Sequence, residues 1–252
     1  MKRSALAAIA TTASVLIAVL GASLASAASA SPAYIGAAVA DSARPAEDRQ
    51  RDAERKPAQT LAFAGVKPGE TIIEIAPGKG YYTRLLSAVV GPKGKVYAAT
   101  SQPQPDAPPP PVQAIASDPH YGNVSVSFQR VADLKLPPGV DVVWTSQNYH
   151  DFHNIPDTDV ATINRAVFAA LKSGGIYFVL DHAAEAGSGS HDTNTLHRID
   201  EETVKQEVTA AGFKLLGESE VLRNKSDSHN AKVFDPEIRG HTDQFMLKFK
   251  KP

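Results

Sequence analysis

The sequence contains no cysteine among its 252 residues. This absence excludes disulfide bonds, thiolate metal sites and a cysteine nucleophile, so stability must come from core packing. An excess of charge of either sign is lacking as well, since 26 lysine and arginine residues are balanced by 27 aspartate and glutamate residues. Because contacts with phosphates need a basic face, we expect a small-molecule substrate and no nucleic acid as partner. The oligomeric state has no signature in the sequence.

Several catalytic motifs are also missing. The chain has neither a Gly-x-Ser-x-Gly elbow nor a Walker-type loop, which disfavours an esterase and an NTPase. It lacks His-Glu-x-x-His as well, and we therefore expect no metal. Histidines nevertheless recur in the second half of the chain, as His150, His153, His182, His191 and His197. With Asp151 or Asp181 as a carboxylate ligand, they leave a metal-dependent hydrolase as an alternative.

The one long apolar run lies at the N-terminus. Lys2 and Arg3 precede an almost uncharged stretch, residues 5–24, and small residues follow at 25–30. This pattern is typical of a secretory signal peptide with a small-residue cleavage site. A membrane anchor is the alternative, because the run approaches the roughly 20 residues needed to span a bilayer. We predict that residues 1–30 are cleaved, which leaves an exported, periplasmic or secreted protein without a stable membrane anchor.

One domain of ordinary size is expected after this signal peptide. Residues 31–44 are rich in alanine and serine without a clear period, which predicts a flexible lead-in. Residues 45–252 form the expected domain, which is long enough to bury a core. It begins with a polar helical stretch, residues 45–64, in which Pro57 is expected to separate two helices. The interspersed charges of this stretch predict a face exposed to solvent.

Strand and helix patterns alternate through the rest of the chain. Short β-branched or apolar runs predict strands at residues 71–75, 95–99, 124–128, 141–145, 176–180, 213–218 and 244–250. Apolar residues at helical spacing predict a helix over residues 81–90 and two more that begin near Asp159, or Asp157, and Asp200. This alternation indicates an α/β fold with a mostly parallel sheet that helices cover on both faces.

The sharpest local signal is the turn Glu74–Gly80, between the first of these strands and the helix that follows. Gly78 and Gly80 have no Cβ, so a ligand can approach the backbone closely there. The N-terminus of the next helix offers free N–H groups and a partial positive charge. In an open α/β sheet, the carboxyl ends of the strands are the expected place for a ligand.

This turn resembles the acidic-x-Gly-x-Gly-x-Gly motif of class I (Rossmann-like) S-adenosylmethionine-dependent methyltransferases. Three further segments are similar to the regions around the third, fourth and fifth strands of that family, namely 131–137, 141–151 and 171–175. More narrowly, five segments resemble a group of predicted methyltransferases with secretion signals, namely 51–57, 77–83, 179–182, 192–200 and 234–240. The resemblance implies a three-layer α/β sandwich with a mostly parallel seven-stranded sheet and a reversed last strand.

The resemblance also implies that S-adenosyl-L-methionine is the cofactor. The matching cofactor-binding positions are Glu74, Ala76, Gly78, Gly80, Thr100, Asp133, Gln147 and Asn148. Gly78 and Gly80 would hold the methionine part, Thr100 the ribose and Asp133 the adenine amino group. Two positions depart from the family, because Ala76 replaces the first glycine and Thr100 stands where an acid usually binds the ribose hydroxyls. Loss of a charge-assisted hydrogen bond lowers the affinity for the cofactor roughly ten- to a hundredfold.

Methyl transfer requires mainly that donor and acceptor are aligned, and a base only where the acceptor must lose a proton. His150, Asp151 and His182 follow the fourth and fifth strands and are the catalytic candidates that face the acceptor; structural hydrogen bonding is their alternative role. Tyr81 and Tyr82 are placed either to close over a ligand or to pack in the core.

The long polar segment 221–242 is a candidate lid or acceptor site. Taken together, the residues predict S-adenosylmethionine-dependent methyl transfer to a small-molecule acceptor outside the cytoplasm. The alternative is a non-catalytic ligand-binding protein that retains the methyltransferase fold.

Overall fold

The computed structural model describes residues 31–130, 135 and 137–252, so the predicted signal peptide and the adenine-binding candidate Asp133 lie outside the described residues. The strands are β1 (Thr71–Ile75), β2 (Lys95–Thr100), β3 (Val124–Phe128), β4 (Val140–Ser146), β5 (Leu171–His182), β6 (Lys214–Ser219) and β7 (Gln244–Lys250). The α-helices are α1 (Ala33–Val39), α2 (Ala46–Gln50), α3 (Asp52–Arg55), α4 (Pro57–Ala64), α5 (Tyr81–Val90), α6 (Pro111–Ser117), α7 (Val160–Ala170) and α8 (Glu201–Ala210). Two short 3₁₀ helices are η1 (Pro119–Tyr121) and η3 (His150–Asn154).

The strands form one seven-stranded sheet in the order β3-β2-β1-β4-β5-β7-β6. The first five strands in this order are parallel to one another, whereas β7 is antiparallel to both β5 and β6. This architecture confirms the predicted fold class, a mostly parallel sheet with a reversed last strand. The chain crosses over between β1 and β4, so the carboxyl ends of these two adjacent strands flank a crevice where ligands bind in open α/β sheets.

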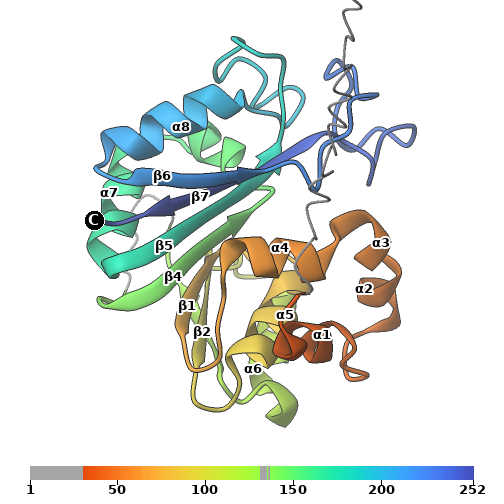
Figure 1. Ribbon diagram of the computed structural model, residues 1–252, viewed down its shortest axis with the longest axis vertical. Helices are drawn as coiled ribbons and strands as arrows, with labels where there is room; N and C mark the ends of the chain where they lie inside the picture. Colours follow the sequence, from red (N-terminus) through yellow and green to blue (C-terminus); the bar gives the residue numbers. More distant parts are fainter. Residues whose placement is uncertain (1–30, 131–134, 136) are drawn as a thin grey trace, which may run out of the picture. The chain divides into compact units, whose positions relative to one another are not determined.

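Helices cover both faces of the sheet (Figure 1). One core contains the apolar faces of α1, α4, α5 and α6, and the other contains those of α7 and α8. Strand β4 contributes to both, because Trp144 packs in the first core and Val143 in the second. Successive side chains of a strand point to opposite faces, and a strand covered on both sides must therefore be apolar at nearly every position.

The predicted helix boundaries agree with local capping chemistry. Helix α5 begins directly after Gly80, and the side chains of Asp159 and Asp200 accept hydrogen bonds from backbone N–H groups at the starts of α7 and α8. Such caps satisfy N–H groups that have no partner within the helix.

Within the described residues, no helix has the length and apolar character needed to cross a bilayer.

The prediction of a flexible lead-in at residues 31–44 is wrong. Helix α1 lies in this segment, and Ile35 and Ala38 are buried in the core that contains α4 and α5. Arg44 is fully buried and forms a bidentate ion pair with Asp52, with N–O distances of 2.9 and 2.6 Å. The sequence did not indicate this amphipathic helix because its buried face consists mainly of alanine, with Tyr34 and Ile35 as the large apolar side chains.

The polar stretch 45–64 is helical and is interrupted at Pro57 as predicted, with a further break at Arg51. The expectation that its charges lie on a solvent-exposed face is only partly correct. Asp48 is 7% exposed and accepts a hydrogen bond from Arg84 Nη1 at 2.9 Å.

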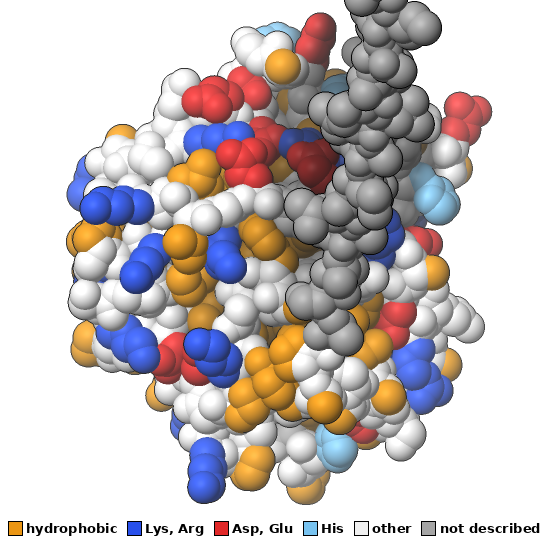
Figure 2. Space-filling view, in the orientation of Figure 1, with side chains coloured by type: hydrophobic (Ala, Val, Ile, Leu, Met, Phe, Trp, Pro, Cys, Tyr) orange, Lys and Arg blue, Asp and Glu red, His pale blue; other side chains and the backbone are white. Residues whose placement is uncertain are grey.

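On the face of the molecule drawn in Figure 2, lysine and arginine side chains are interspersed with acidic, apolar and uncharged ones.

Candidate functional site

A cavity of about 810 Å³ lies beside the turn that joins β1 to α5, and we call it the main cavity. Its volume falls within the range of small-molecule sites, roughly 300–1,000 Å³. It is lined by residues from β1 and the turn after it, from α2, α3, α5 and η3, from the ends of β2 and β4, and from the segment before β7. They are Glu47, Asp48, Arg51, Glu54, Arg55, Glu74, Ala76, Pro77, Gly78, Lys79, Tyr81, Tyr82, Thr100, Ser146, Gln147, Asn148, Asp151, Arg239 and Gly240.

The turn after β1 owes its shape to three residues with left-handed backbone conformations, Ala76 (φ 52°), Gly78 (φ 57°) and Gly80 (φ 79°). A Cβ atom at Gly80 would lie 2.1 Å from Ile115 Cδ1, whereas a Cβ atom at Gly78 would meet nothing within 4 Å. Gly80 is therefore required by packing against α6. Gly78 borders open space in the main cavity, as the sequence predicts for a ligand-binding glycine.

Asn148 holds this turn to the neighbouring strand. Its Nδ2 donates hydrogen bonds to the carbonyl oxygens of Ile75 and Ala76, both at 3.1 Å. Its Oδ1 accepts a short hydrogen bond from the hydroxyl of Thr145 at the end of β4. Asn148 lines the main cavity, but its amide is largely engaged in fixing the backbone of the β1 turn.

Glu74 is the buried acid of the motif. It is 3% exposed, and Thr83 Oγ1 donates a hydrogen bond of 2.5 Å to its carboxylate. Burial raises the pKa of Glu74 to about 7, although the hydrogen bond from Thr83 and the charge of Arg55 oppose this effect. The carboxyl group at the inner wall of the main cavity therefore changes charge near neutral pH.

Arg55, at the end of α3, was not among the predicted site residues. Its Nη2 donates a 2.7 Å hydrogen bond to Gln147 Oε1, and its guanidinium lies 4.6 Å from the ring centre of Tyr81. Its Nε is buried without a partner, and no carboxylate of the described residues lies within ion-pair distance. Burial lowers its pKa. Arg55 as a whole is partly buried, and its guanidinium is a group that can hold an anionic ligand.

The two tyrosines of α5 pack in the core, which is one of the two roles that the sequence left open, and they also border the main cavity. Tyr81 and Tyr82 are at most 4% exposed, and both line the main cavity. The hydroxyl of Tyr81 donates to Asp52 Oδ1 at 2.7 Å, and the ring of Tyr82 lies 4.9 Å from that of Trp144 in the core. The rings of both tyrosines contact the guanidinium of Arg55.

Of the three predicted catalytic residues, Asp151 alone lines the main cavity. His150 is 2% exposed, and its ring Nδ1 and backbone N–H lie 2.8 and 2.7 Å from the two oxygens of Asp181. His182 Nδ1 lies 2.8 Å from Thr242 Oγ1, and burial lowers the pKa of His182 to about 4. His150 is therefore buried and His182 partly buried; neither lines the main cavity, and hydrogen bonds hold both side chains.

Burial also opposes protonation of His150. The negative charge and hydrogen bond of Asp181 outweigh this effect and raise the pKa of His150. Burial alone would likewise raise the pKa of Asp181, but His150 and the adjacent amides lower it.

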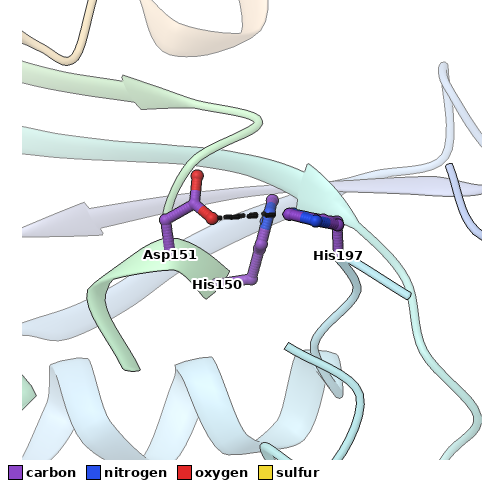
Figure 3. Close-up of side chains that lie close together, drawn as sticks. All are labelled: His150, Asp151 and His197. Atoms are coloured by element: carbon purple, nitrogen blue, oxygen red, sulfur yellow. Dashed lines mark ion pairs between the residues drawn. The ribbon is translucent and has the colours of Figure 1, made fainter. Parts of the chain in front are cut away.

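The five histidines considered as metal ligands separate into two groups. His153 pairs with Glu207 and His191 with Asp192, and His182 is bonded to Thr242. His150 and His197, in contrast, converge on Asp151 (Figure 3). His197 belongs to the segment between β5 and α8. Its spacing in the sequence gives no indication that it lies near His150 and Asp151.

Thr100, the predicted ribose-binding residue, lies at the end of β2 and lines the main cavity. Gln147 lines it too, with a left-handed backbone (φ 59°). Of the long segment 221–242, only Arg239 and Gly240 reach the main cavity.

Comparison with known proteins agrees with this fold. No family model matches the chain. The ubiquinone/menaquinone biosynthesis C-methyltransferase UbiE from two strains of Vibrio cholerae is 25% identical over 206 residues, which cover 75% of this chain. The chain spans about 65% of the length of these curated relatives.

Two solved structures extend the comparison. An S-adenosylmethionine-dependent methyltransferase from Aquifex aeolicus is 18% identical, with a TM-score of 0.58 and coverage of 82% of this chain and 97% of that one. Aeropyrum pernix fibrillarin in complex with S-adenosyl-L-methionine is 19% identical, with a TM-score of 0.50 and coverage of 79% and 76%. The chain therefore has the class I methyltransferase fold.

Proposed function

We propose that the chain binds S-adenosyl-L-methionine in the main cavity and transfers its methyl group to a small-molecule acceptor. The observation that carries this proposal is Arg55, a partly buried cation whose Nε is buried without a partner and which forms no ion pair with a carboxylate of the described residues, beside an open cavity at the β1 turn. The carboxylate of the methionine part would supply the missing negative charge. Charge-assisted hydrogen bonds of this kind are among the strong ones in proteins.

The other residues of the cavity fit the rest of the same molecule. Gly78 leaves room for close approach to the backbone, and Glu74 provides a carboxyl group for the cationic part of the methionine moiety. Thr100 offers a neutral hydroxyl to the ribose. The similarity to methyltransferases of the same fold supports this assignment.

S-adenosylmethionine, when bound, supplies a methyl group on a sulfonium, which is already a good leaving group. The chain has to align the acceptor and exclude water. Asp151, whose side chain is 50% exposed, is the carboxylate placed to accept a proton from an acceptor in the main cavity. His150 Nε2 lies 3.3 Å from Asp151 Oδ1 and positions that carboxylate.

We further propose that this activity takes place outside the cytoplasm, because residues 1–30 have the pattern of a cleaved secretion signal. The balance of 26 basic and 27 acidic residues, and the interspersed charges on the face drawn in Figure 2, support a small-molecule acceptor over a nucleic acid.

Calorimetric titration of the mature chain, which we define as residues 31–252, with S-adenosylmethionine tests the proposal. We expect saturable binding, and Arg55→Met should weaken it roughly 10- to 100-fold through loss of a charged hydrogen bond. Arg49→Met is the matched control, because Arg49 is exposed and does not line the cavity. Equal affinities of the two variants would contradict the role of Arg55.

Absence of binding at millimolar concentration would contradict the proposal itself. It would favour the alternative of a non-catalytic ligand-binding protein, which the neutral Thr100 at the end of β2 supports. Where binding is found, incubation with culture metabolites should yield products heavier by one methyl group, and these identify the acceptor.

A further inference from the structure

We propose that His150, Asp151 and His197 bind one divalent transition-metal ion of the zinc type at the edge of the main cavity. Their side chains point toward one another, two from η3 and the third from the segment before α8 (Figure 3). One ligand atom from each residue lies within 4.8 Å of those of the other two. The site is assigned from this geometry and does not depend on the proposed methyl transfer.

The separations match those around a small metal ion. His150 Nε2 lies 3.3 Å and His197 Nδ1 lies 3.7 Å from the same oxygen, Oδ1 of Asp151. Zinc is about 2.0–2.2 Å from nitrogen and oxygen ligands in proteins, which places two ligands of a tetrahedral ion about 3.3 Å apart. Two of the three separations therefore lie within a few tenths of an ångström of this value, and the two imidazole nitrogens lie within 4.8 Å of each other.

The surroundings of His150 prepare its Nε2 to be a ligand. Its Nδ1 lies 2.8 Å from Asp181 Oδ1, and the second oxygen of Asp181 accepts the backbone N–H of His150. A hydrogen bond from Nδ1 to a buried carboxylate fixes the ring and leaves the lone pair of Nε2 directed at the other two residues. Histidines that bind metals in proteins almost always have such a partner.

The backbone also holds His197 at the site. His197 has φ of +56°, an uncommon conformation for a residue other than glycine, and its ring lies 4.9 Å from that of Phe234. The next residue, Arg198, is fully buried in an ion pair with Asp227. Strained backbone that neighbouring contacts enforce is a feature of functional sites.

The donor set selects the class of ion. Two imidazole nitrogens and one carboxylate oxygen suit zinc or a related transition metal, whereas calcium and magnesium prefer sites built from oxygen. Three protein ligands leave at least one coordination position open. Because Asp151 also lines the main cavity, a molecule bound at that position would lie at the cavity edge.

Metal titration of the mature chain, prepared without a histidine tag and treated with a chelator, tests this site. We expect one equivalent of Co²⁺ to bind with visible absorption bands of a low-symmetry site, and Zn²⁺ to displace it. His197→Ala should weaken binding at least tenfold. His191→Ala is the matched control, since His191 lies in the same segment with its side chain 83% exposed.

Two results would overturn the site: no stoichiometric binding by the wild-type chain at micromolar metal, or the same affinity in the His197 and His191 variants. Far-UV circular dichroism of each variant excludes loss of the fold as a cause. Titration of the metal-free chain with S-adenosylmethionine separates the two proposals, because it reports on the main cavity whether or not the histidine site binds a metal.

Discussion

Arg198 and Asp227 form a bidentate ion pair in which both side chains are at most 1% exposed. Arg198 Nη1 and Nη2 lie 2.8 and 3.1 Å from the two carboxylate oxygens, and Nε donates to the carbonyl of Ala231. This pair joins the segment before α8 to the long polar segment 221–242. The ion pair therefore fixes the long segment to the domain at Asp227, whereas Arg239 and Gly240 are its two residues at the main cavity.

Replacement of Asp227 by Asn should destabilise the chain strongly. The guanidinium of Arg198 would remain buried without a counter-charge, and breaking a buried pair in this way costs about 3–5 kcal/mol. Urea unfolding monitored by circular dichroism measures the change. Arg165→Met is the control, because the Arg165–Asp159 pair is more than 60% exposed on both sides and its loss should cost less than about 1 kcal/mol. Similar losses in both variants would contradict a structural role for the buried pair.

Local pattern is enough to predict the strands of the sheet and the helices α5, α7 and α8, whereas helix α6, which follows a proline-dense stretch, is not predicted. Strand β1 and helix α5 have the predicted bounds because their apolar periodicity and the glycines beside them determine local structure directly. The turn between them is predicted as a ligand site for the same reason, and it borders the main cavity.

Contacts between distant segments are not predictable in this way. The polar helical pattern around Arg55 predicts a charge exposed to solvent. Its sequence does not reveal that Arg55 hydrogen-bonds to Gln147, which follows β4 and lies 92 residues further along the chain. His182 lies at the end of β5 as predicted, but its side chain is bonded to Thr242 rather than turned to the cavity. His197 meets Asp151 only because the chain after β5 returns to η3.

Substitution of Gly78 by Ala should weaken binding of S-adenosylmethionine roughly tenfold or more, as an added methyl group does in a fitted site. Gly65→Ala is a matched control, since Gly65 also has a left-handed backbone (φ 81°) and open space where the added methyl group would lie, but it is outside the main cavity. Both variants should lose about 1 kcal/mol of stability through backbone strain. Calorimetry distinguishes them, and equal affinities would place the ligand elsewhere.

Substitution of Thr100 by Glu should strengthen the same binding. Thr100 lines the main cavity at the end of β2, where a carboxylate can accept hydrogen bonds from the ribose hydroxyls. A charge-assisted hydrogen bond contributes about 1.5–3 kcal/mol, so the affinity should rise roughly ten- to a hundredfold. Thr100→Gln, which has the same length without the charge, should give a smaller gain. If the Glu variant binds no more tightly than the Gln variant, the ribose does not lie beside β2.

The buried carboxyl group of Glu74 should make stability depend on pH. Its pKa in the folded chain is about 7, above the value of 4.5 for an unperturbed glutamate, because burial disfavours the ionised form. Its contribution to stability is therefore fully present below about pH 4.5 and is lost as the pH rises toward 7, a change of about 3 kcal/mol. Glu74→Gln should remove this loss while it retains an oxygen that accepts from Thr83 Oγ1.

Urea unfolding of both proteins at pH 5 and pH 8 isolates the effect of Glu74 from that of other titrating groups. The variant should gain stability relative to the wild type at pH 8, and a gain of the same size at pH 5 would contradict the assignment of the pKa to Glu74.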